Sequence, residues 1–246
     1  MREIQVDKTK NYIHLFSGGL DSTYTLLKLA TDVYEGKKEE HQIQPIFIDY
    51  GQHAAPYERK SVQDVTNFIR STLDETDFLL DPIHISLRSD LLTWCNNVAF
   101  TGKEVGDETC EIQNRNMILV SIVASYLMAC AENQGIETTV FEIHSGLKDG
   151  EMPDSNRHFF DRLEELLREY KGRYPIKVEL IPNMSRDTIC GKIKRLLKGS
   201  EAQLKQLLSL TVSCFSPIDG RKPCGNCWKC KRMKQEKKFA KLSGLS

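Results

Sequence analysis

A glycine pair near the amino terminus separates a strand-like stretch from a helix-like stretch. Residues 16–23 read Phe-Ser-Gly-Gly-Leu-Asp-Ser-Thr. Phe16 is also the last residue of the apolar run Tyr-Ile-His-Leu-Phe. Adjacent glycines permit positive φ and a close approach of backbone N–H groups to phosphate, and a helix amino terminus attracts anions. The lysine of a Walker-type loop, G-x-x-x-x-G-K-[ST], is absent. The pattern therefore predicts a phosphate-binding loop of another kind.

The polar side chains of this loop have different expected tasks. Ser17, Ser22 and Thr23 offer hydroxyl donors to phosphate. Asp21 is anionic, so holding Mg²⁺ or capping the helix suits it better than direct contact with phosphate. The alternative without a ligand is a simple N-cap turn at the start of a helix.

A second cluster with chemical potential lies near the carboxyl end. Cys214, Cys224, Cys227 and Cys230 have the spacing C-x9-C-x2-C-x2-C. In a chain without signs of secretion, this spacing favours a tetrahedral Zn²⁺ site over disulfides. Sulfur fills all four positions around such a metal, so we expect a structural zinc and no catalytic one.

Two smaller expectations concern the surroundings of these thiols. The nearby basic residues should offset the thiolate charge; they are Arg221, Lys222, Lys229, Lys231 and Arg232. The remaining cysteines share no spacing, and we expect them to be unreactive; they are Cys95, Cys110, Cys130 and Cys190.

Charge is balanced over the whole chain but not along it. The 246 residues include 34 basic and 34 acidic side chains, so composition alone indicates neither a basic nucleic-acid binder nor an acidic protein. From Arg221 onward nine basic residues face one acidic residue, Glu236, and the preceding part carries about minus eight. The amino terminus has no apolar signal core, and the apolar run 117–130 is too short to cross a membrane. We expect a soluble, cytoplasmic protein.

Strand-like and helix-like segments alternate along the chain. The expected strands are 12–16, 43–49, 83–87, 138–146 and 176–182. The expected helices are 21–33, 56–70, 117–130, 157–170 and 186–198, and 89–115 reads as a loop-rich excursion. This alternation predicts an α/β fold with a parallel sheet covered on both faces. Ligands of such sheets bind beyond the carboxyl ends of the strands, where the glycine loop lies.

The glycine loop resembles a known phosphate loop. Ser17-Gly-Gly-Leu-Asp-Ser22 is similar to the SGG-x-DS loop of the N-type ATP pyrophosphatase (PP-loop) superfamily. Its enzymes cradle the pyrophosphate end of ATP and break the α–β bond, which adenylates a carboxylate or carbonyl oxygen. The resemblance implies a Rossmann-like fold of the adenine-nucleotide α-hydrolase type, with ATP as co-substrate and Mg²⁺. The ATP-binding residues it implies are Phe16, Ser17, Gly18, Gly19, Leu20, Asp21, Ser22, Thr23, Asp49 and Arg115.

The resemblance narrows to the 7-cyano-7-deazaguanine synthases (QueC-like). It extends over residues 47–62, 113–126, 144–163 and 213–230. Members adenylate 7-carboxy-7-deazaguanine, form the amide with ammonia and dehydrate it to a nitrile with a second ATP; their zinc is structural. The resemblance implies Asp21, Arg115 and Asp154 as catalytic residues, and Asn116, Met152, Pro153 and Asp154 around the substrate. It divides the chain into a PP-loop domain, 1–210, and a zinc-binding segment packed on it, 211–246.

The departures from that family lie around the substrate. Gln113-Asn114-Arg115-Asn116 replaces Pro-Gly-Arg-Asn, and 150–155 replaces Ser-Gly-Tyr-Pro-Asp-Cys-Arg with a loop about three residues shorter. Met152 takes the place of an aromatic residue that would stack on the base. Asp154 remains and can accept hydrogen bonds from a purine-like edge; alternatively, it caps a helix that starts near Ser155.

Other functions stay open at the level of sequence. A relative of the family would pass the same activated acyl group to a protein amine in an anti-phage system. A tRNA-modifying PP-loop enzyme would use the basic tail with Trp228 and Phe239, although each C-x2-C pair already belongs to the zinc set. A zinc-binding adaptor with a decayed loop is disfavoured by the complete loop. Nucleic acid is an unfavoured partner, no membrane is expected, and the expected assembly is a homodimer.

Overall fold

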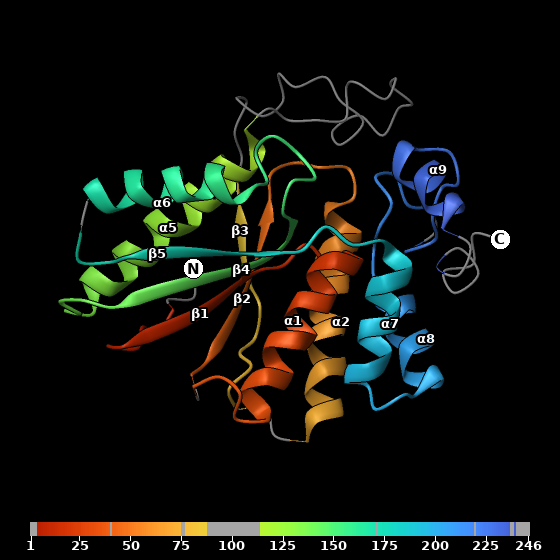
Figure 1. Cartoon of the computed structure of the whole chain (residues 1–246), viewed down its shortest axis with the longest axis horizontal. Helices are drawn as coiled ribbons and strands as arrows, with labels where there is room; N and C mark the ends of the chain where they lie inside the picture. Colours follow the sequence, from red (N-terminus) through yellow and green to blue (C-terminus); the bar gives the residue numbers. More distant parts are fainter. Residues whose placement is uncertain are drawn as a thin grey trace.

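A single parallel sheet forms the centre of the molecule. The computed structural model describes residues 4–39, 41–74, 77–87, 114–170, 172–218, 220–236 and 239. Its strands are β1 (Lys10–Leu15), β2 (Ile43–Asp49), β3 (Ile83–Ser86), β4 (Val140–Lys148) and β5 (Ile176–Ile181). They pair in the order β3-β2-β1-β4-β5, all parallel (Figure 1). The α/β fold expected from the alternating pattern is confirmed.

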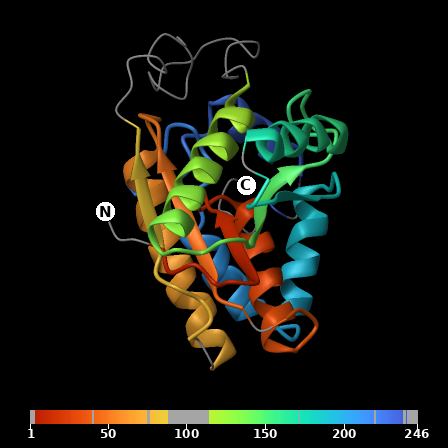
Figure 2. The ribbon, with the colours of Figure 1, turned by 90° about the vertical axis from the view of Figure 1, so that its left-hand side faces the viewer.

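Helices cover both faces of the sheet (Figure 2). One face carries α1 (Leu20–Tyr34), α2 (Ala55–Leu73), α7 (Arg186–Leu196) and α8 (Glu201–Leu210), and the other carries α5 (Arg115–Asn133) and α6 (Arg157–Tyr170). Successive strand residues point to opposite faces. Accordingly Tyr12 packs with the α1 and α2 layer, and its neighbour Ile13 packs with the α5 and α6 layer.

The structure differs from the expected helices in two places. Two helices, α8 and α9 (Trp228–Gln235), follow the segment that we expected to contain the last clear helix. The buried Leu204, Leu207 and Leu208 give α8 the helical spacing i, i+3, i+4, which was readable in the sequence. On α6 the sequence spacing of Phe160, Leu163, Leu166 and Leu167 predicts one apolar face, but the Leu166 side chain is 61% exposed.

Helix α5 is longer than the run 117–130 suggested. It spans 19 residues and is long and apolar enough, by length and composition, to cross a membrane. Val120, Val123, Ala124 and Leu127 are nevertheless fully buried in the core shared with the sheet. This burial marks α5 as a core helix. Most of the excursion expected at 89–115 lies outside the described residues, namely 89–113 with Cys95 and Cys110.

The order of the strands creates one crevice. The chain runs from β1 outward through β2 to β3 and then returns to place β4 on the other side of β1. Leu15, the last residue of β1, pairs in register with Ser145 of β4. The segments that leave the carboxyl ends of β1 and β4 are therefore neighbours, and this switch point is where doubly wound sheets bind ligands.

Candidate functional site

The glycine loop fills the gap between β1 and α1. Gly18 has φ +70°, and a Cβ at this position would lie 2.7 Å from the Ser61 Oγ of α2. The Ser61 hydroxyl lies 2.9 Å from the Gly18 oxygen and 2.6 Å from the Leu210 oxygen, so it ties the loop to the end of α8. A side chain at position 18 would break this contact, which explains the glycine.

The start of α1 is open to a ligand. Gly19 is its N-cap residue and has no side chain that could cap the helix, while Ser213 Oγ accepts a hydrogen bond from the Leu20 amide at 3.4 Å. The Ser17 and Ser22 hydroxyls lie 3.1 Å apart beside it. The other N–H groups of the first turn, the positive end of the helix dipole and two hydroxyls suit the binding of an anion.

A cavity of about 620 Å³ opens over this loop. Its wall contains most of the expected ATP-binding residues: Phe16, Ser17, Gly19, Leu20, Asp21, Ser22 and Arg115. All four expected substrate residues line it too: Asn116, Met152, Pro153 and Asp154. Three expected ATP residues lie elsewhere, since Gly18 turns to Ser61, Thr23 is fully buried, and Asp49 pairs with Arg59 at 2.9 Å.

Asp154 joins the short substrate loop to the start of α5. Its Oδ2 accepts a hydrogen bond from the Asn116 backbone at 3.2 Å, and Asn116 Nδ2 donates to Oδ1 at 3.1 Å. The alternative in which Asp154 caps a helix starting near Ser155 is wrong, because α6 begins at Arg157 and Asn156 Oδ1 accepts from the Phe159 amide. Each carboxylate oxygen keeps a second lone pair, so a ligand can still bind.

Arg115 enters the cavity from the first turn of α5. The preceding Asn114 has φ +55°, which turns the chain into the helix. Asparagine tolerates this left-handed conformation better than other side chains, so it can replace the glycine of the family pattern. The expected position of Arg115 and Asn116 at a helix amino terminus is confirmed.

Lys148 is a cavity residue that the sequence analysis missed. It is the last residue of β4, its side chain is 4% exposed, and its Nζ lies 3.2 Å from Asp21 Oδ1. Gly146 makes this proximity possible, because a Cβ there would lie 2.4 Å from the Ser22 amide nitrogen. A polar residue just past an expected strand, 138–146, was an available signal.

Glu58 and Lys229 are two more cavity residues without an assigned motif. Burial raises the pKa of Glu58, while a hydrogen bond from Gln52 at 2.7 Å and the charge of Lys229 act against that rise. Burial likewise lowers the pKa of Lys229, whose ammonium lies 4.3 Å from the centre of the Phe215 ring. Both groups keep some exposed surface because they face the cavity. The two contribute opposite charges to one wall.

The four expected metal ligands do come together. The sulfurs of Cys214, Cys224, Cys227 and Cys230 all lie within 4.8 Å of one another, and three of the pairs are 3.6, 3.8 and 3.9 Å apart. Zn–S bonds of about 2.3 Å at tetrahedral angles place sulfurs about 3.8 Å apart. The cluster therefore fits a zinc ion.

The basic residues near the cysteines have partners of their own. Arg221 pairs with Asp64 on α2, Lys229 lies over Phe215, and Arg232 lies 3.4 Å from Glu151. The expectation that the basic residues near the cluster offset thiolate charge stays a prediction beside these contacts. Backbone amides approach the sulfurs instead: those of Ser216 and Cys224 lie 3.4 and 3.3 Å from Cys214 Sγ.

Comparison with known proteins agrees with this geometry. Residues 11–241 match the family model described as "Queuosine biosynthesis protein QueC". A 7-cyano-7-deazaguanine synthase of Pyrococcus furiosus is 29% identical, with 89% of this chain and 88% of the relative covered. That of Methanobrevibacter smithii is 27% identical over 97% of both chains. A third, 7-cyano-7-deazaguanine synthase 1 of Desulfitobacterium hafniense, is 26% identical over 88% of this chain and 86% of the relative. A match over nearly the whole length, with the loop and the cysteine cluster in place, shows that the chain belongs to the QueC family.

Proposed function

We propose that this chain is an ATP-dependent C–N ligase that converts 7-carboxy-7-deazaguanine to 7-cyano-7-deazaguanine with ammonia. The observation that carries the proposal is the shared cavity, where the phosphate loop, Arg115 and the Asp154–Asn116 pair face one another. The names of the relatives support the same substrate.

In the first step the substrate carboxylate oxygen attacks the α-phosphorus of ATP. The bond from that phosphorus to the bridging oxygen breaks, and pyrophosphate leaves with the electron pair. The amides at the start of α1 and the Ser17 and Ser22 hydroxyls hold the leaving group. Asp21 would hold Mg²⁺, and the metal would offset phosphate charge. Arg115 stabilises the charge that develops on the carboxylate and α-phosphate.

Asp154 reads the other end of the substrate. Its free lone pairs accept hydrogen bonds from the N1–H and N2–H₂ of a deazaguanine, while its present bonds to Asn116 fix its orientation. Met152 and Pro153 form the apolar side of this subsite. Asn116 thereby acts as a positioning residue for Asp154.

Several narrower expectations belong to the same proposal. The zinc is structural, the protein is cytoplasmic, and it acts as a homodimer. Ammonia is the nitrogen donor, since no feature of the described residues favours a protein amine. A tRNA thiolation activity is disfavoured because the C-x2-C cysteines belong to the metal cluster, and Cys130 and Cys190 are buried.

Product analysis tests the proposal. We expect mass spectrometry to detect 7-cyano-7-deazaguanine, AMP and pyrophosphate after incubation with ATP, Mg²⁺, 7-carboxy-7-deazaguanine and ammonium. ADP with inorganic phosphate would contradict the adenylation step. A reaction that stops at the acyl-adenylate or the amide until a protein amine is added would contradict the nitrile synthase.

The phosphate loop has its own test. We expect Asp21→Asn to lower the rate of adenylation at least about 10²-fold, the size of losing one preorganised contact to developing charge. Ser17→Ala should have an effect of the same kind. The measurement is ATP–pyrophosphate exchange, and a rate within a few-fold of the parent would remove Asp21 from the reaction.

A further inference from the structure

We propose that Lys148 supplies the cation that the phosphate loop lacks, and that it binds the pyrophosphate leaving group. Residues 16–23 contain no lysine or arginine, although ATP would bring about four negative charges to this loop. The proposal rests on the ATP chemistry inferred above, and it assigns a phosphate ligand outside the loop that resembles known phosphate loops.

The backbone of β4 brings Lys148 to the loop. Ser145 pairs in register with Leu15, and Gly146 lies directly against the first turn of α1 because it has no Cβ. Lys148 ends the strand two residues later and lines the same cavity as Ser17, Gly19 and Ser22. The close backbone contact of Gly146 with the first turn of α1 thus fixes the distance between Lys148 and the loop.

The ion pair between Lys148 and Asp21 lacks a well-oriented hydrogen bond. A lysine that is 4% exposed needs a charged partner, and Asp21 Oδ1 lies 3.2 Å away. Yet this buried oxygen accepts no hydrogen bond of good geometry from the described residues. The two groups therefore attract each other by charge alone. Glu151, the other nearby carboxylate, is 4.0 Å away. Lys148 and Asp21 can therefore each exchange the other for a ligand.

Besides Arg115, three other cations on the cavity wall are held by partners away from the phosphate loop. Arg186 bonds to Glu236 at 2.9 Å, Arg232 lies 3.4 Å from Glu151, and the Lys229 ammonium lies over the Phe215 ring. Among the described salt bridges of the cavity, the one from Lys148 reaches the phosphate loop.

The charges define two states of the pair. Without nucleotide, Lys148 neutralises Asp21. With ATP bound, the Lys148 ammonium turns to the β- and γ-phosphate oxygens, which leaves Asp21 able to hold Mg²⁺. As the bond to the α-phosphorus breaks, the electron pair moves to the bridging oxygen of pyrophosphate. Lys148 keeps its proton throughout and stabilises that charge.

Binding of inorganic pyrophosphate tests this role without any deazaguanine. Calorimetry in saturating Mg²⁺ should show affinity about 10- to 100-fold weaker for Lys148→Met, the size of a lost charge-assisted contact. Lys148→Arg should recover most of the loss because it keeps the charge. Lys177→Met is the matched control: it removes an exposed lysine from the neighbouring strand β5 and should bind like the parent.

The outcomes are distinguishable. Unchanged or tighter pyrophosphate binding by Lys148→Met would overturn the proposal, because Lys148 would then only neutralise Asp21. Should that variant fail to fold, judged by Tm and zinc content, Lys148→Gln is measured under the same criterion. Weaker pyrophosphate binding by Lys148→Met, together with no nitrile formed by the parent protein, would support the role of Lys148 and contradict the proposed substrate.

Discussion

Asp154 accepts a hydrogen bond from the first turn of α5 and is also expected to bind the substrate. Because its present hydrogen bonds go to Asn116, removing it affects α5 as well as the ligand. We expect Asp154→Ala to raise the KM for the deazaguanine about 10- to 100-fold, with the KM for ATP nearly unchanged. Steady-state kinetics with each substrate varied in turn measures this split. An equal rise in both constants would assign Asp154 a purely structural role.

Arg115 should behave in the opposite way. Its charge matters most when negative charge develops in the transition state, so we expect Arg115→Ala to lower kcat about 10²-fold with little change in KM. Arg115→Lys is the control that keeps the charge at the same helix terminus. A variant with raised KM and normal kcat would place Arg115 in ground-state binding instead.

At the scale of elements, the contact between β4 and α1 is the tightest constraint on the site. A methyl group at Gly146 would lie 2.4 Å from the Ser22 nitrogen, so one of the two backbones must shift. We expect Gly146→Ala to lower Tm and to weaken ATP binding at least tenfold, because the shift displaces the amides of the phosphate loop. The control is Gly191→Ala in α7, where the added methyl meets open space and alanine favours the helix. Normal ATP affinity in Gly146→Ala would show that the loop position tolerates the shift.

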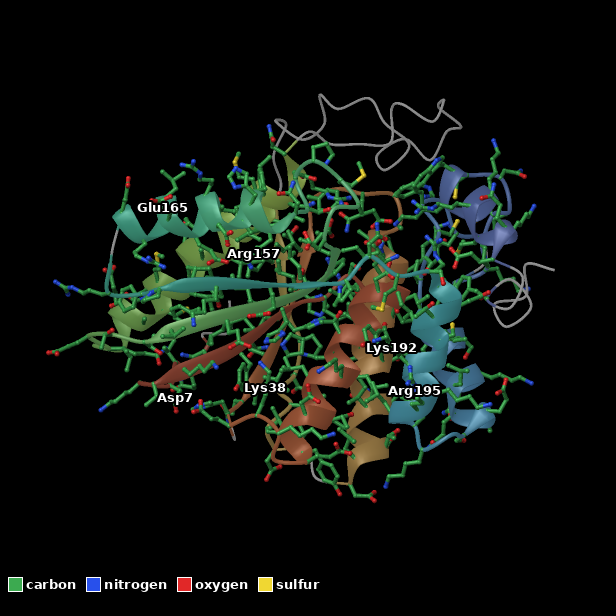
Figure 3. All side chains as sticks on the ribbon, viewed as in Figure 1. Asp7, Lys38, Arg157, Glu165, Lys192 and Arg195 are labelled. Atoms are coloured by element: carbon green, nitrogen blue, oxygen red, sulfur yellow. The ribbon has the colours of Figure 1, made fainter. Side chains whose placement is uncertain are left out.

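Strand β4 also carries a charge cluster far from the zinc segment. Glu142 is the centre of this cluster: its carboxylate lies 2.7 Å from Lys10 and 2.7 Å from His144. Lys38, labelled in Figure 3, is the third partner of Glu142. Burial by itself would raise the pKa of Glu142, but these partners outweigh it and hold the pKa well below its usual range. The unfolded chain therefore binds the proton more tightly, and the stability from Glu142 is lost as pH falls below about 4.5.

Glu142→Gln tests this cluster. We expect the free energy of unfolding at pH 7 to fall by about 1–3 kcal/mol, because the cations lose a charged acceptor. The difference from the parent should shrink as the pH is lowered through the acid range, since the carboxylate of the unfolded parent then becomes protonated while the folded one stays ionised. Urea unfolding at several pH values measures it. A constant difference at all pH values would mean that packing, not charge, accounts for the loss.

The elements could be predicted from the sequence more completely than the site. Strands and helices have periodic apolar patterns, and the five expected strands and the position of Arg115 are confirmed by the structure. Short helices such as α9 carry too few periods to be recognised. Lys148, Glu58 and Lys229 come from three distant segments, and their meeting depends on strand order and on packing. Apart from the place of Lys148 just past an expected strand, no local pattern contains that information.

At the scale of the whole molecule, the cysteine segment closes the cavity. The Val212 amide donates to the Gly18 oxygen at 2.9 Å, directly beside the phosphate loop. Trp228 and Lys229, which lie between Cys227 and Cys230 in sequence, line the cavity. Glu236 at the end of α9 bonds to Arg186 at the start of α7. The division at 210/211 remains a prediction, and these contacts make the zinc segment a wall of the site.

Loss of zinc should therefore affect ligand binding as well as folding. We expect Cys227→Ser to lose the single zinc ion per chain and to lower Tm by at least about 5 °C, because metal binding in such small sites is coupled to folding. Affinity for ATP should fall with it, since the first turn of α9 is no longer held beside the cavity. Metal analysis, thermal unfolding and calorimetry with ATP measure the three effects.

Cys130→Ala is the matched control for this experiment. It removes a buried thiol from α5, outside the cluster, and should keep both the zinc and the ATP affinity while losing some stability to the small cavity. Full zinc content in Cys227→Ser would mean that the ligand set is wrong. Zinc loss with intact ATP affinity would mean that packing of Met233 and Phe239 into the α1, α7 and α8 core holds the wall without the metal.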